Sequence, residues 1–503
     1  MPSQFKLAPM FAAALIYSGG PVSEQTAFAG SSAVGENGTA SLSRAGAFVA
    51  KADDPTAVVH NPSGIAKLRR PTVFIGSSLI QHNARFQRVG NYQVDPLDST
   101  SEAYAGVAFP EITSEGSPSA IPMVMASFPI TDKLVIGGGI FAPHLATPGD
   151  YPTTVTVADG VEAPSPQRYD YVDISGIVVL PTLSVGYAIS DNLRVGARVS
   201  VAYADISAVI VAQALANEAE QASYDTLVNL DLLDRATPAF GLGVQYDLRD
   251  FEFAAAYNSQ VVLGLKGTAS VELDTLLGSV VQIDPVEDDR ARCAPGGSRR
   301  ALRACVSYTI PQTAAIGARW VAKDAAGDEL ADIEFDIRWE NWKAADSLSA
   351  TIDGRDTLLG TELGTTTSRS GFRDVFAFRL GGEKRFSFKS SQLKVRGGIG
   401  YDTAAAPNSW TRIGVDGTPH LTLATGAGFE VGHWKFDLGF SFVATPRRFV
   451  EDQIVLPGTP LEARRQPDIP AASLEGENPA NPYNAGSYSR NYLLGSAAVS
   501  FTF

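Results

Sequence analysis

The chain has 503 residues, 45% of them hydrophobic and only 19% charged, and it carries a formal net charge of −14. Beyond the N-terminal region no run of about 18 apolar residues occurs, which argues against helical membrane spans. The acidic balance argues against nucleic acid as a partner. The 47 glycines and the Thr/Ser/Val-rich runs favour strands and turns, so we predict an all-β protein.

The first 29 residues have the organisation of a secretory signal. Lys6 precedes an apolar run over residues 7–17, and small and polar residues follow up to Ala27-Phe28-Ala29. A charged start, a short apolar core and an A-x-A site predict cleavage after Ala29. We therefore expect a signal peptide over residues 1–29 and an exported mature chain.

Residues 30–70 have neither helical nor strand periodicity and are rich in Ala, Gly and Ser. The segment ends in "DDPTAVVHNPSGIAKLRR", which combines turn residues with small apolar ones. Its backbone polar groups need partners that it cannot supply itself. We expect the rest of the fold to supply them.

Several stretches beyond residue 70 alternate strictly between apolar and polar side chains. They include residues 193–203, 333–341, 393–401 and 434–442. Aromatic residues mark the ends of such stretches: Tyr187, Tyr203, Tyr257, Trp339, Tyr401 and Trp434. A soluble sandwich also alternates, but aromatics at the strand ends together with a secretory signal indicate an outer-membrane β-barrel.

The connections between these stretches fall into two classes. Six are short polar turns, at residues 130–133, 190–192, 247–250, 323–329, 387–391 and 431–433. Seven are long and irregular, near residues 88–118, 144–172, 208–236, 266–306, 343–372, 402–420 and 446–490. Outer-membrane barrels have short periplasmic turns and long extracellular loops. The pattern therefore predicts 14 antiparallel strands over residues 71–503, closed by a last strand that ends at Phe503.

A barrel of 14 strands encloses a lumen too wide for its own side chains to fill, because about eight strands is the size at which they suffice. Residues 30–70 precede the first strand and are rich in small residues, so they can form a compact coil. We expect them to plug the lumen, where polar side chains such as Arg194 and Glu334 satisfy their backbone.

The plug sequence "SLSRAGAFVAKADDPTAVVHNPSGIAKL" (41–68) resembles the N-terminal hatch of the FadL/TodX family of outer-membrane long-chain fatty acid and hydrocarbon transporters. The residues that match the family's three short motifs include Arg44, Asp53, Asp54, Asn61, Pro62 and Ser63, with Ser in place of Gly at Ser43 and in place of Ala at Ser63. Similar segments continue in order at residues 121–145, 257–269 and 335–348.

The resemblance implies passive uptake of long-chain fatty acids or similar hydrophobic compounds across the outer membrane of a Gram-negative bacterium. Ligand would be captured by extracellular loops, held in a lumen pocket and released sideways under control of the hatch. The implied partners are the hydrophobic ligand, outer-membrane lipid, lipopolysaccharide and the barrel-assembly machinery, with the protein a monomer. No enzyme activity and no cofactor are expected.

Two sets of residues are candidates for ligand binding. Residues 212–233 have helical composition, and Leu215, Leu230 and Leu233 could line a capture groove or pack on the neighbouring loop at 273–283. The lumen cations could hold a carboxylate or pair with lumen acids such as Glu334, Asp336, Glu340 and Asp437; these cations are Arg194, Arg198, Arg338, Lys394 and Arg396.

Cys293 and Cys305 are the two cysteines of the chain, and an exported protein with so close a pair is expected to form a loop disulfide. The basic residues around them could contact lipopolysaccharide phosphates or simply be solvated. Asp53 and Asp54 could bind a cation, but capping is the simpler role, and no metal site is predicted.

Three other functions are weighed against transport of hydrophobic compounds. A lipase-type barrel is disfavoured because the five histidines fall in no nucleophile motif. A general porin for polar solutes is disfavoured by the plug. An adhesin that displays its long loops, notably the Pro-rich residues 456–482, remains an alternative.

Overall fold

The computed structural model describes residues 37–503 except 97, 117, 144–149, 171, 214–221, 274–282, 287–292, 294–301, 357–361, 415–416 and 451–483. The expected signal peptide and the Pro-rich residues 456–482 lie outside the described residues. No helix in the described ranges is long and apolar enough to cross a membrane.

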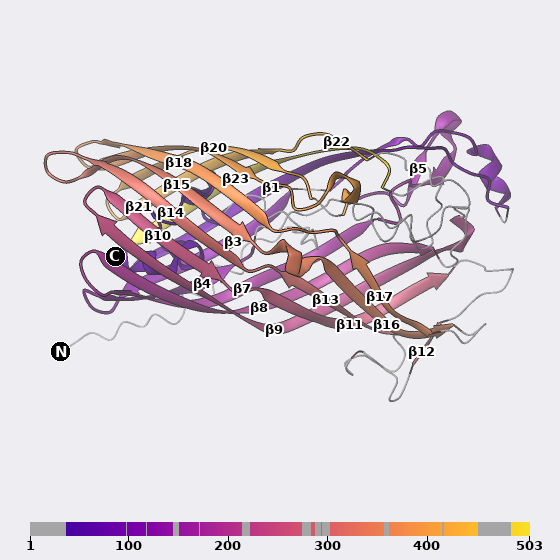
Figure 1. The fold of residues 1–503 in the computed structure, drawn as a ribbon, viewed down its shortest axis with the longest axis horizontal. Coiled ribbons are helices and arrows are strands. Elements are labelled where there is room, and N and C mark those ends of the chain that lie inside the picture. The colour runs from indigo at the N-terminus through magenta and orange to yellow at the C-terminus, as the bar shows by residue number, and fades with distance from the viewer. Residues whose placement is uncertain are drawn as a thin grey trace.

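The described residues form a closed barrel of 14 antiparallel strands, as the turn count predicted (Figure 1). In order around the wall these strands are β1 (Thr72–Arg88), β3 (Ser119–Pro129), β4 (Leu134–Phe141), β7 (Asp173–Ala188), β8 (Leu193–Gln213), β9 (Asp225–Leu248), β10 (Phe251–Asn258), β14 (Thr313–Lys323), β15 (Glu329–Glu340), β18 (Val375–Ser387), β19 (Ser391–Asp402), β20 (His420–Val431), β21 (Trp434–Ala444) and β23 (Gly486–Thr502). The last strand pairs with the first over its whole length, from Thr72↔Thr502 to Arg88↔Gly486.

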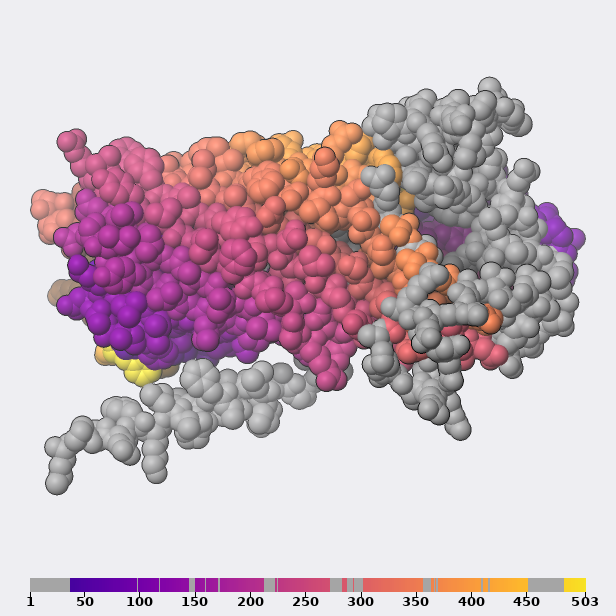
Figure 2. Space-filling model, turned by 60° about the horizontal axis from the view of Figure 1, so that its bottom comes forward, coloured from indigo at the N-terminus to yellow at the C-terminus, as the bar shows by residue number. Residues whose placement is uncertain are grey.

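Short turns join the strands at one end of the barrel, and the long connections lie at the other, which we call the extracellular end (Figure 1). Smaller elements in these connections are β2 (Glu111–Thr113), β5 (Thr154–Thr156), β6 (Glu162–Pro164), β12 (Ile283–Pro285), β22 (Arg448–Val450) and the 3-10 helices η2 (Ser99–Ala103), η3 (Ala158–Gly160), η4 (Ala222–Tyr224), η5 (Trp342–Ala345) and η6 (Asn408–Trp410). On the face shown in Figure 2, the colour of the wall passes from violet through magenta to orange, so segments lie side by side in chain order.

In three of the connections expected to be irregular, most of the described residues belong to strands. β8 and β9 extend past the wall, and β11 (Val261–Leu273), β13 (Leu302–Ile310), β16 (Ser347–Asp356) and β17 (Glu362–Arg369) pair beside them in that order. We call these strands the extracellular extension. The expected helix over 212–233 is therefore wrong for residues 225–233, which belong to β9, whereas residues 214–221 lie outside the described ranges.

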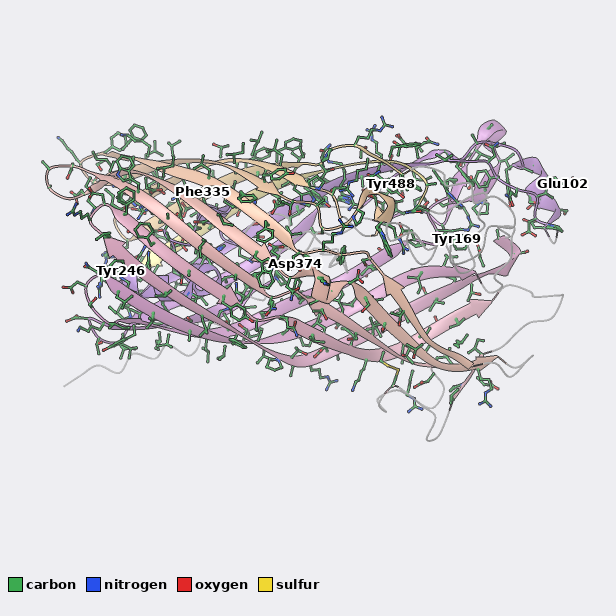
Figure 3. All side chains as sticks on the ribbon, in the orientation of Figure 1. Glu102, Tyr169, Tyr246, Phe335, Asp374 and Tyr488 are labelled. Atoms are coloured by element: carbon green, nitrogen blue, oxygen red, sulfur yellow. A yellow bond between two sulfur atoms is a disulfide. The ribbon has the colours of Figure 1, made fainter. Side chains whose placement is uncertain are left out.

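The apolar face of the sheet changes sides between the wall and the extension. In the wall part of β8, Val199 is exposed while Arg198 faces inward and is buried. In the extension part, Ile206 faces inward and is 1% exposed, while Ser207 lies on the opposite, exposed face. The wall thus presents apolar side chains to lipid, as Tyr246 and Phe335 do (Figure 3), and the extension presents polar ones to water.

Residues 37–70, which we call the hatch segment, lie inside the barrel. They form α1 (Thr39–Leu42), α2 (Ala57–His60) and η1 (Pro62–Lys67), and nearly all of residues 38–66 are buried. α1 contacts β20, β21 and β23, whereas η1 contacts β4, β7, β8 and β9 on the other side. The aperiodic N-terminal segment therefore spans the lumen from wall to wall.

Glycines line the wall where the hatch segment touches it. A Cβ atom at Gly196 would lie 2.3 Å from the carbonyl carbon of Pro62, and one at Gly398 would lie 2.3 Å from that of Arg44. Such distances do not occur for real Cβ atoms, so only glycine permits this approach. Seven wall strands supply such a residue, and we call the set the glycine belt: Gly186, Gly196, Gly243, Gly381, Gly398, Gly426 and Gly439.

Candidate functional site

A row of three carboxylates on β15 holds the hatch segment by ion pairs. Asp332, Glu334 and Asp336 alternate along the strand, so all three point into the lumen. Arg44 of the hatch segment places Nη1 2.6 Å from Asp332 Oδ1 and Nη2 3.1 Å from Glu334 Oε2. Lys51 Nζ lies 3.1 Å from Asp332 Oδ2, so two hatch cations converge on this row.

The same carboxylates also bind the hatch backbone. The N–H groups of Phe48 and Val49 donate to Asp336 Oδ2 at 2.9 and 3.0 Å, and that of Ala50 donates to Glu334 Oε1 at 2.6 Å. An aperiodic segment inside a barrel has no strand partner for these groups, and an unsatisfied buried N–H costs about 1–3 kcal/mol. The carboxylates of the β15 row therefore supply the hydrogen-bond acceptors that the hatch segment cannot provide for its own backbone N–H groups.

The other hatch-motif residues shape the segment itself. Asp54 Oδ1 accepts from the N–H of Thr56 at 2.8 Å, and Asn61 Oδ1 accepts from that of Ser63 at 3.2 Å while its Nδ2 donates to Val49 O. Pro62 begins η1, where a missing N–H costs nothing. These contacts fit the capping role, and no cluster of possible metal ligands occurs in the described residues.

Four of the five candidate lumen cations pair with acids of the wall. Arg194 Nη1 lies 2.7 Å from Asp247, Lys394 Nζ 2.5 Å from Glu430, and Arg338 Nη1 3.9 Å from Glu340. Arg396 bridges Glu383 and Asp437 at 2.7 and 2.6 Å. The pairs of Arg194, Lys394 and Arg396 join different strands, whereas Arg338 and Glu340 both lie on β15.

Arg198 differs from the other four because no carboxylate of the described residues pairs with it. Its Nη2 donates to Asn258 Oδ1 at 3.0 Å, and its guanidinium lies 5.2 Å from the ring centroid of Phe141. Nε and Nη1 are buried without a hydrogen-bond partner. A buried cation with unused donors is costly. Arg198 therefore keeps two unused hydrogen-bond donors inside the lumen. It follows Gly196 on β8 by two residues, and Gly196 is the position where β8 touches the hatch segment.

An apolar column runs from the hatch segment into the extracellular extension. It is one contiguous cluster of buried side chains that begins at Val58 and Ile65 of the hatch segment, passes Phe141, and continues to Leu263 and Leu265 of β11. Its members from the strands come from inward positions of β1, β3, β4, β7, β8, β9, β11 and β13. Arg198 borders the column through Phe141, so an apolar cluster and a buried cation with unused donors lie together.

The predicted capture leucines do not act as a set. Leu230 is buried in the apolar column, Leu233 lies on the opposite face of β9, and Leu215 lies outside the described residues. A cavity of about 570 Å³ instead opens at the extracellular end, lined among others by Tyr104, Arg168 and Leu227. It lies between η2, the β5–β6 hairpin and the tip of β8 and β9.

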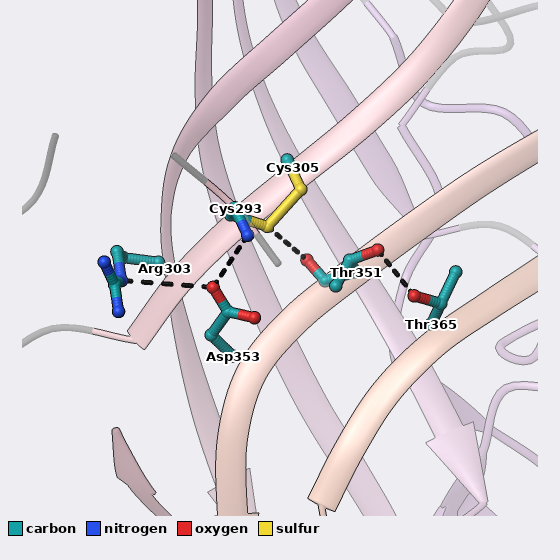
Figure 4. The surroundings of a disulfide bond; sticks show 6 residues. All are labelled: Cys293, Arg303, Cys305, Thr351, Asp353 and Thr365. Atoms are coloured by element: carbon teal, nitrogen blue, oxygen red, sulfur yellow. Dashed lines mark hydrogen bonds and ion pairs between the residues drawn. A yellow bond between two sulfur atoms is a disulfide. The ribbon is translucent and has the colours of Figure 1, made fainter. Parts of the chain in front are cut away.

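Cys293 and Cys305 form the expected disulfide (Figure 4). Cys305 lies on β13, paired with Thr351 of β16, and the N–H of Cys293 donates to Asp353 Oδ2 at 2.9 Å. The bond therefore fastens the connection that precedes β13 to the polar outer face of the extension.

A sequence model of the family described as outer membrane protein transport protein (OMPP1/FadL/TodX) matches residues 21–469. The chain belongs to this family. FadL/TodX proteins are outer-membrane transport channels for hydrophobic compounds in Gram-negative bacteria and are not enzymes. The family and the barrel thus confirm the predicted class of protein and its location.

Solved structures of this family share the fold. The chain is similar to a Pseudomonas aeruginosa FadL homologue (15% identity, 93% of this chain and 99% of that one, TM-score 0.66). It is also similar to the Ralstonia pickettii toluene transporter TbuX (14%, 92% and 98%, 0.58) and to the Pseudomonas putida toluene transporter TodX (13%, 95% and 99%, 0.58). No curated protein sequence matches the chain significantly.

Proposed function

We propose that this FadL/TodX protein takes up long-chain fatty acids, with Arg198 as the site for the carboxylate and the apolar column as the site for the acyl chain. The observation that supports the proposal is the pair of unpartnered nitrogens on a buried guanidinium beside an apolar cluster. A neutral hydrocarbon would leave both nitrogens unsatisfied, whereas a carboxylate would supply a charged acceptor to the guanidinium.

The energetics favour an amphiphile with one acidic end. Burial of a methylene group contributes about 0.8 kcal/mol, so an acyl chain gains steadily along the column. A charge-assisted hydrogen bond to the guanidinium adds about 1.5–3 kcal/mol. Neither term requires a covalent step, in agreement with passive uptake.

The hatch segment would act as the gate of this pathway. The apolar column ends on Val58 and Ile65, so a ligand at its lower end rests on the hatch segment. Release then requires the contacts between the β15 carboxylates and residues 44–51 to rearrange. We assign the gating role to residues 30–70 as part of the same proposal.

Substitution of the open cation tests the head-group site. Arg198→Ala should weaken binding of a fluorescent long-chain fatty acid in detergent by about ten- to a hundredfold, because a charge-assisted bond is lost. Binding of a neutral aromatic hydrocarbon should be unchanged. Arg194→Ala is the matched control, since Arg194 already pairs with Asp247.

Two results would contradict the fatty acid assignment. Equal affinities for fatty acid in wild type and Arg198→Ala would show that the carboxylate binds elsewhere. Tight binding of toluene with no binding of fatty acid to the wild type would instead favour a neutral cargo, the class that the names of TodX and TbuX indicate for those proteins.

A further inference from the structure

The inner wall contains the same arrangement of three residues at two places. In each, an arginine side chain crosses a glycine of the next strand and binds an acceptor on the strand after that. In the first, Arg396 of β19 places Nη1 2.6 Å from Asp437 Oδ1 of β21. A Cβ atom at Gly428 of β20 would lie 2.9 Å from Arg396 Nη2 and 2.5 Å from Asp437 Oδ1. Glycine is therefore required for this bridge to form.

The second bridge joins Arg198 of β8 to Asn258 of β10 across Gly241 of β9. Gly241 lies opposite Arg198 on one side and opposite Asn258 on the other. A Cβ atom at Gly241 would lie 2.7 Å from Arg198 Nε and 2.9 Å from Asn258 Oδ1. The two bridges thus share their parts and differ in the acceptor, which is a carboxylate in one and a neutral amide in the other.

The amide acceptor leaves the charge of Arg198 without compensation. Asn258 Oδ1 accepts a hydrogen bond from Nη2 at 3.0 Å but carries no charge. The residues beside this bridge are neutral as well, because Ser184 of β7 lies opposite Arg198 and Thr313 of β14 lies opposite Asn258. The first carboxylate along this row is Glu340 of β15, two strands beyond Asn258. Arg198 therefore differs from Arg396 through its partner.

The surroundings of Asn258 would accommodate an aspartate without rearrangement. Asn258 Nδ2 donates to Thr313 Oγ1 at 3.2 Å. A hydroxyl can donate as well as accept, so Thr313 can equally donate to a carboxylate oxygen in the place of that nitrogen. The other oxygen would keep the position of Oδ1, within ion-pair distance of Arg198. The choice between amide and acid at this position thus decides whether the guanidinium is neutralised.

We propose that Asn258 determines the specificity of the lumen site: as a neutral partner it leaves Arg198 to recognise the carboxylate of a ligand, and an aspartate in its place would make the site select neutral compounds. The proposal rests on the proposed function and deepens it, because it assigns the choice between acidic and neutral cargo to one residue. Asn258 is a positioning residue that acts through Arg198, and the apolar column serves both classes of ligand alike.

The exchange of amide for acid tests the proposal on the full-length protein in detergent. Binding of pyrene-labelled dodecanoic acid is compared with binding of the corresponding dodecanol. Asn258→Asp should lower the affinity for the acid by about tenfold, because an internal carboxylate pairs with Arg198 and repels that of the ligand. Affinity for the alcohol should stay within about twofold, since the buried alkyl chain is the same. The ratio of the two affinities is therefore the decisive quantity.

Two variants control for effects other than charge in the lumen. Asn258→Leu removes the amide contact without adding a charge, so it should keep the preference for the acid. Asn192→Asp adds the same charge at an exposed position of the short turn between β7 and β8 and should bind both ligands as wild type does. Heat-modifiable migration on gels establishes that each variant has formed the barrel.

The outcomes separate this inference from the proposed function. An unchanged ratio in Asn258→Asp, or an equal loss of acid preference in Asn258→Leu, would overturn the role of Asn258. Both results leave the fatty acid site intact as long as Arg198→Ala still weakens binding of the acid. A wild-type protein that binds the alcohol as tightly as the acid would instead contradict the proposed function, and the specificity assigned to Asn258 with it.

Discussion

The wall and the extracellular extension are built from some of the same strands, yet their apolar faces point in opposite directions. Val199 of β8 faces lipid and Ile206 of the same strand faces the lumen. A strand places alternate side chains on opposite faces in both regions. What changes is the solvent. Hydrocarbon surrounds the wall, whose interior is polar. Water surrounds the extension, whose interior is filled with apolar side chains.

This difference explains why the wall needs a plug and the extension does not. The polar interior of the wall is bridged by the hatch segment and its ion pairs, while the interior of the extension packs on itself as the apolar column. A ligand moving inward therefore passes from an apolar to a polar interior, and Arg198 lies where the two meet. The predictions below test each half of this comparison.

Loss of the hatch segment should affect the wall most. Deletion of residues 30–66 should leave the barrel assembled and raise its ion conductance by roughly tenfold, because 14 strands cannot fill their own lumen. The milder Asn61→Ala/Pro62→Ala should give an intermediate rise, and saturable fatty acid uptake should fall in both. Single-channel recording and labelled uptake measure these effects. Wild-type values in the deletion variant would show that the segment is only a leader.

Truncation of a leucine should destabilise the two regions to different extents. Leu265→Ala, at an inward and fully buried position of β11, should lower the free energy of unfolding of the extension by about 2–5 kcal/mol. Leu183→Ala, at a wall position 70% exposed to lipid, should cost far less because lipid fills the space. Hydrogen exchange resolved by region measures both, and equal costs would refute the reversal of faces.

The disulfide should stabilise only the extension. Cys293→Ser/Cys305→Ser opens a short ring, and the expected loss is about 2–4 kcal/mol. The loss should appear as faster proteolysis of β13 and β16, while heat-modifiable migration of the barrel on gels stays as in wild type. A barrel that unfolds at lower temperature in this variant would show that the two regions are coupled.

The smallest effect concerns the loops that cover the extracellular end. Burial raises the pKa of Asp170, and Arg412 and the backbone N–H groups of Ile413 and Gly414 offset this only in part. The folded form therefore holds the proton more tightly, so the contact loses stability as the pH rises from the ordinary pKa of an aspartate to the raised value. Asp170→Asn should remove this dependence. Trp410 fluorescence as a function of pH measures it, with Asp98→Asn as the control.

The wall was predictable because its signals are local. Alternation, turn residues and a terminal Phe503 determine the number of strands and the closing pair, and both were confirmed. The extension was missed because its strands follow a bulge or a break. Opposite Ala202 and Ala204 of β8, one additional residue in β9 changes the inward positions of β9 from odd, as at Ala239, to even, as at Leu232. A leucine-rich run such as residues 227–233 then fits helical spacing as well as strand spacing.

The site was predictable in kind but not in detail. Residue types alone gave five equivalent lumen cations, and only the partners distinguish Arg198 from Arg396, which lies between two acids. The role of Asp332 in holding the hatch segment was missed, although its spacing from Glu334 and Asp336 placed it on the same face. The glycine belt was also missed, because glycines within strands indicate close approach only when the approaching segment is known.

The glycine belt gives the inner wall a smooth surface at the level of the hatch segment. At Gly196, Gly381 and Gly398 the hatch backbone lies directly against the wall, so no wall side chain at these positions obstructs sliding. The contacts that resist withdrawal are ion pairs with β15, β18 and β10 and the hydrogen bonds from the hatch backbone to Glu334 and Asp336. Under a pulling force applied to the N-terminus, the hatch segment would therefore leave in one abrupt step when these ion pairs break, followed by low-friction extraction, rather than by gradual unravelling against the wall.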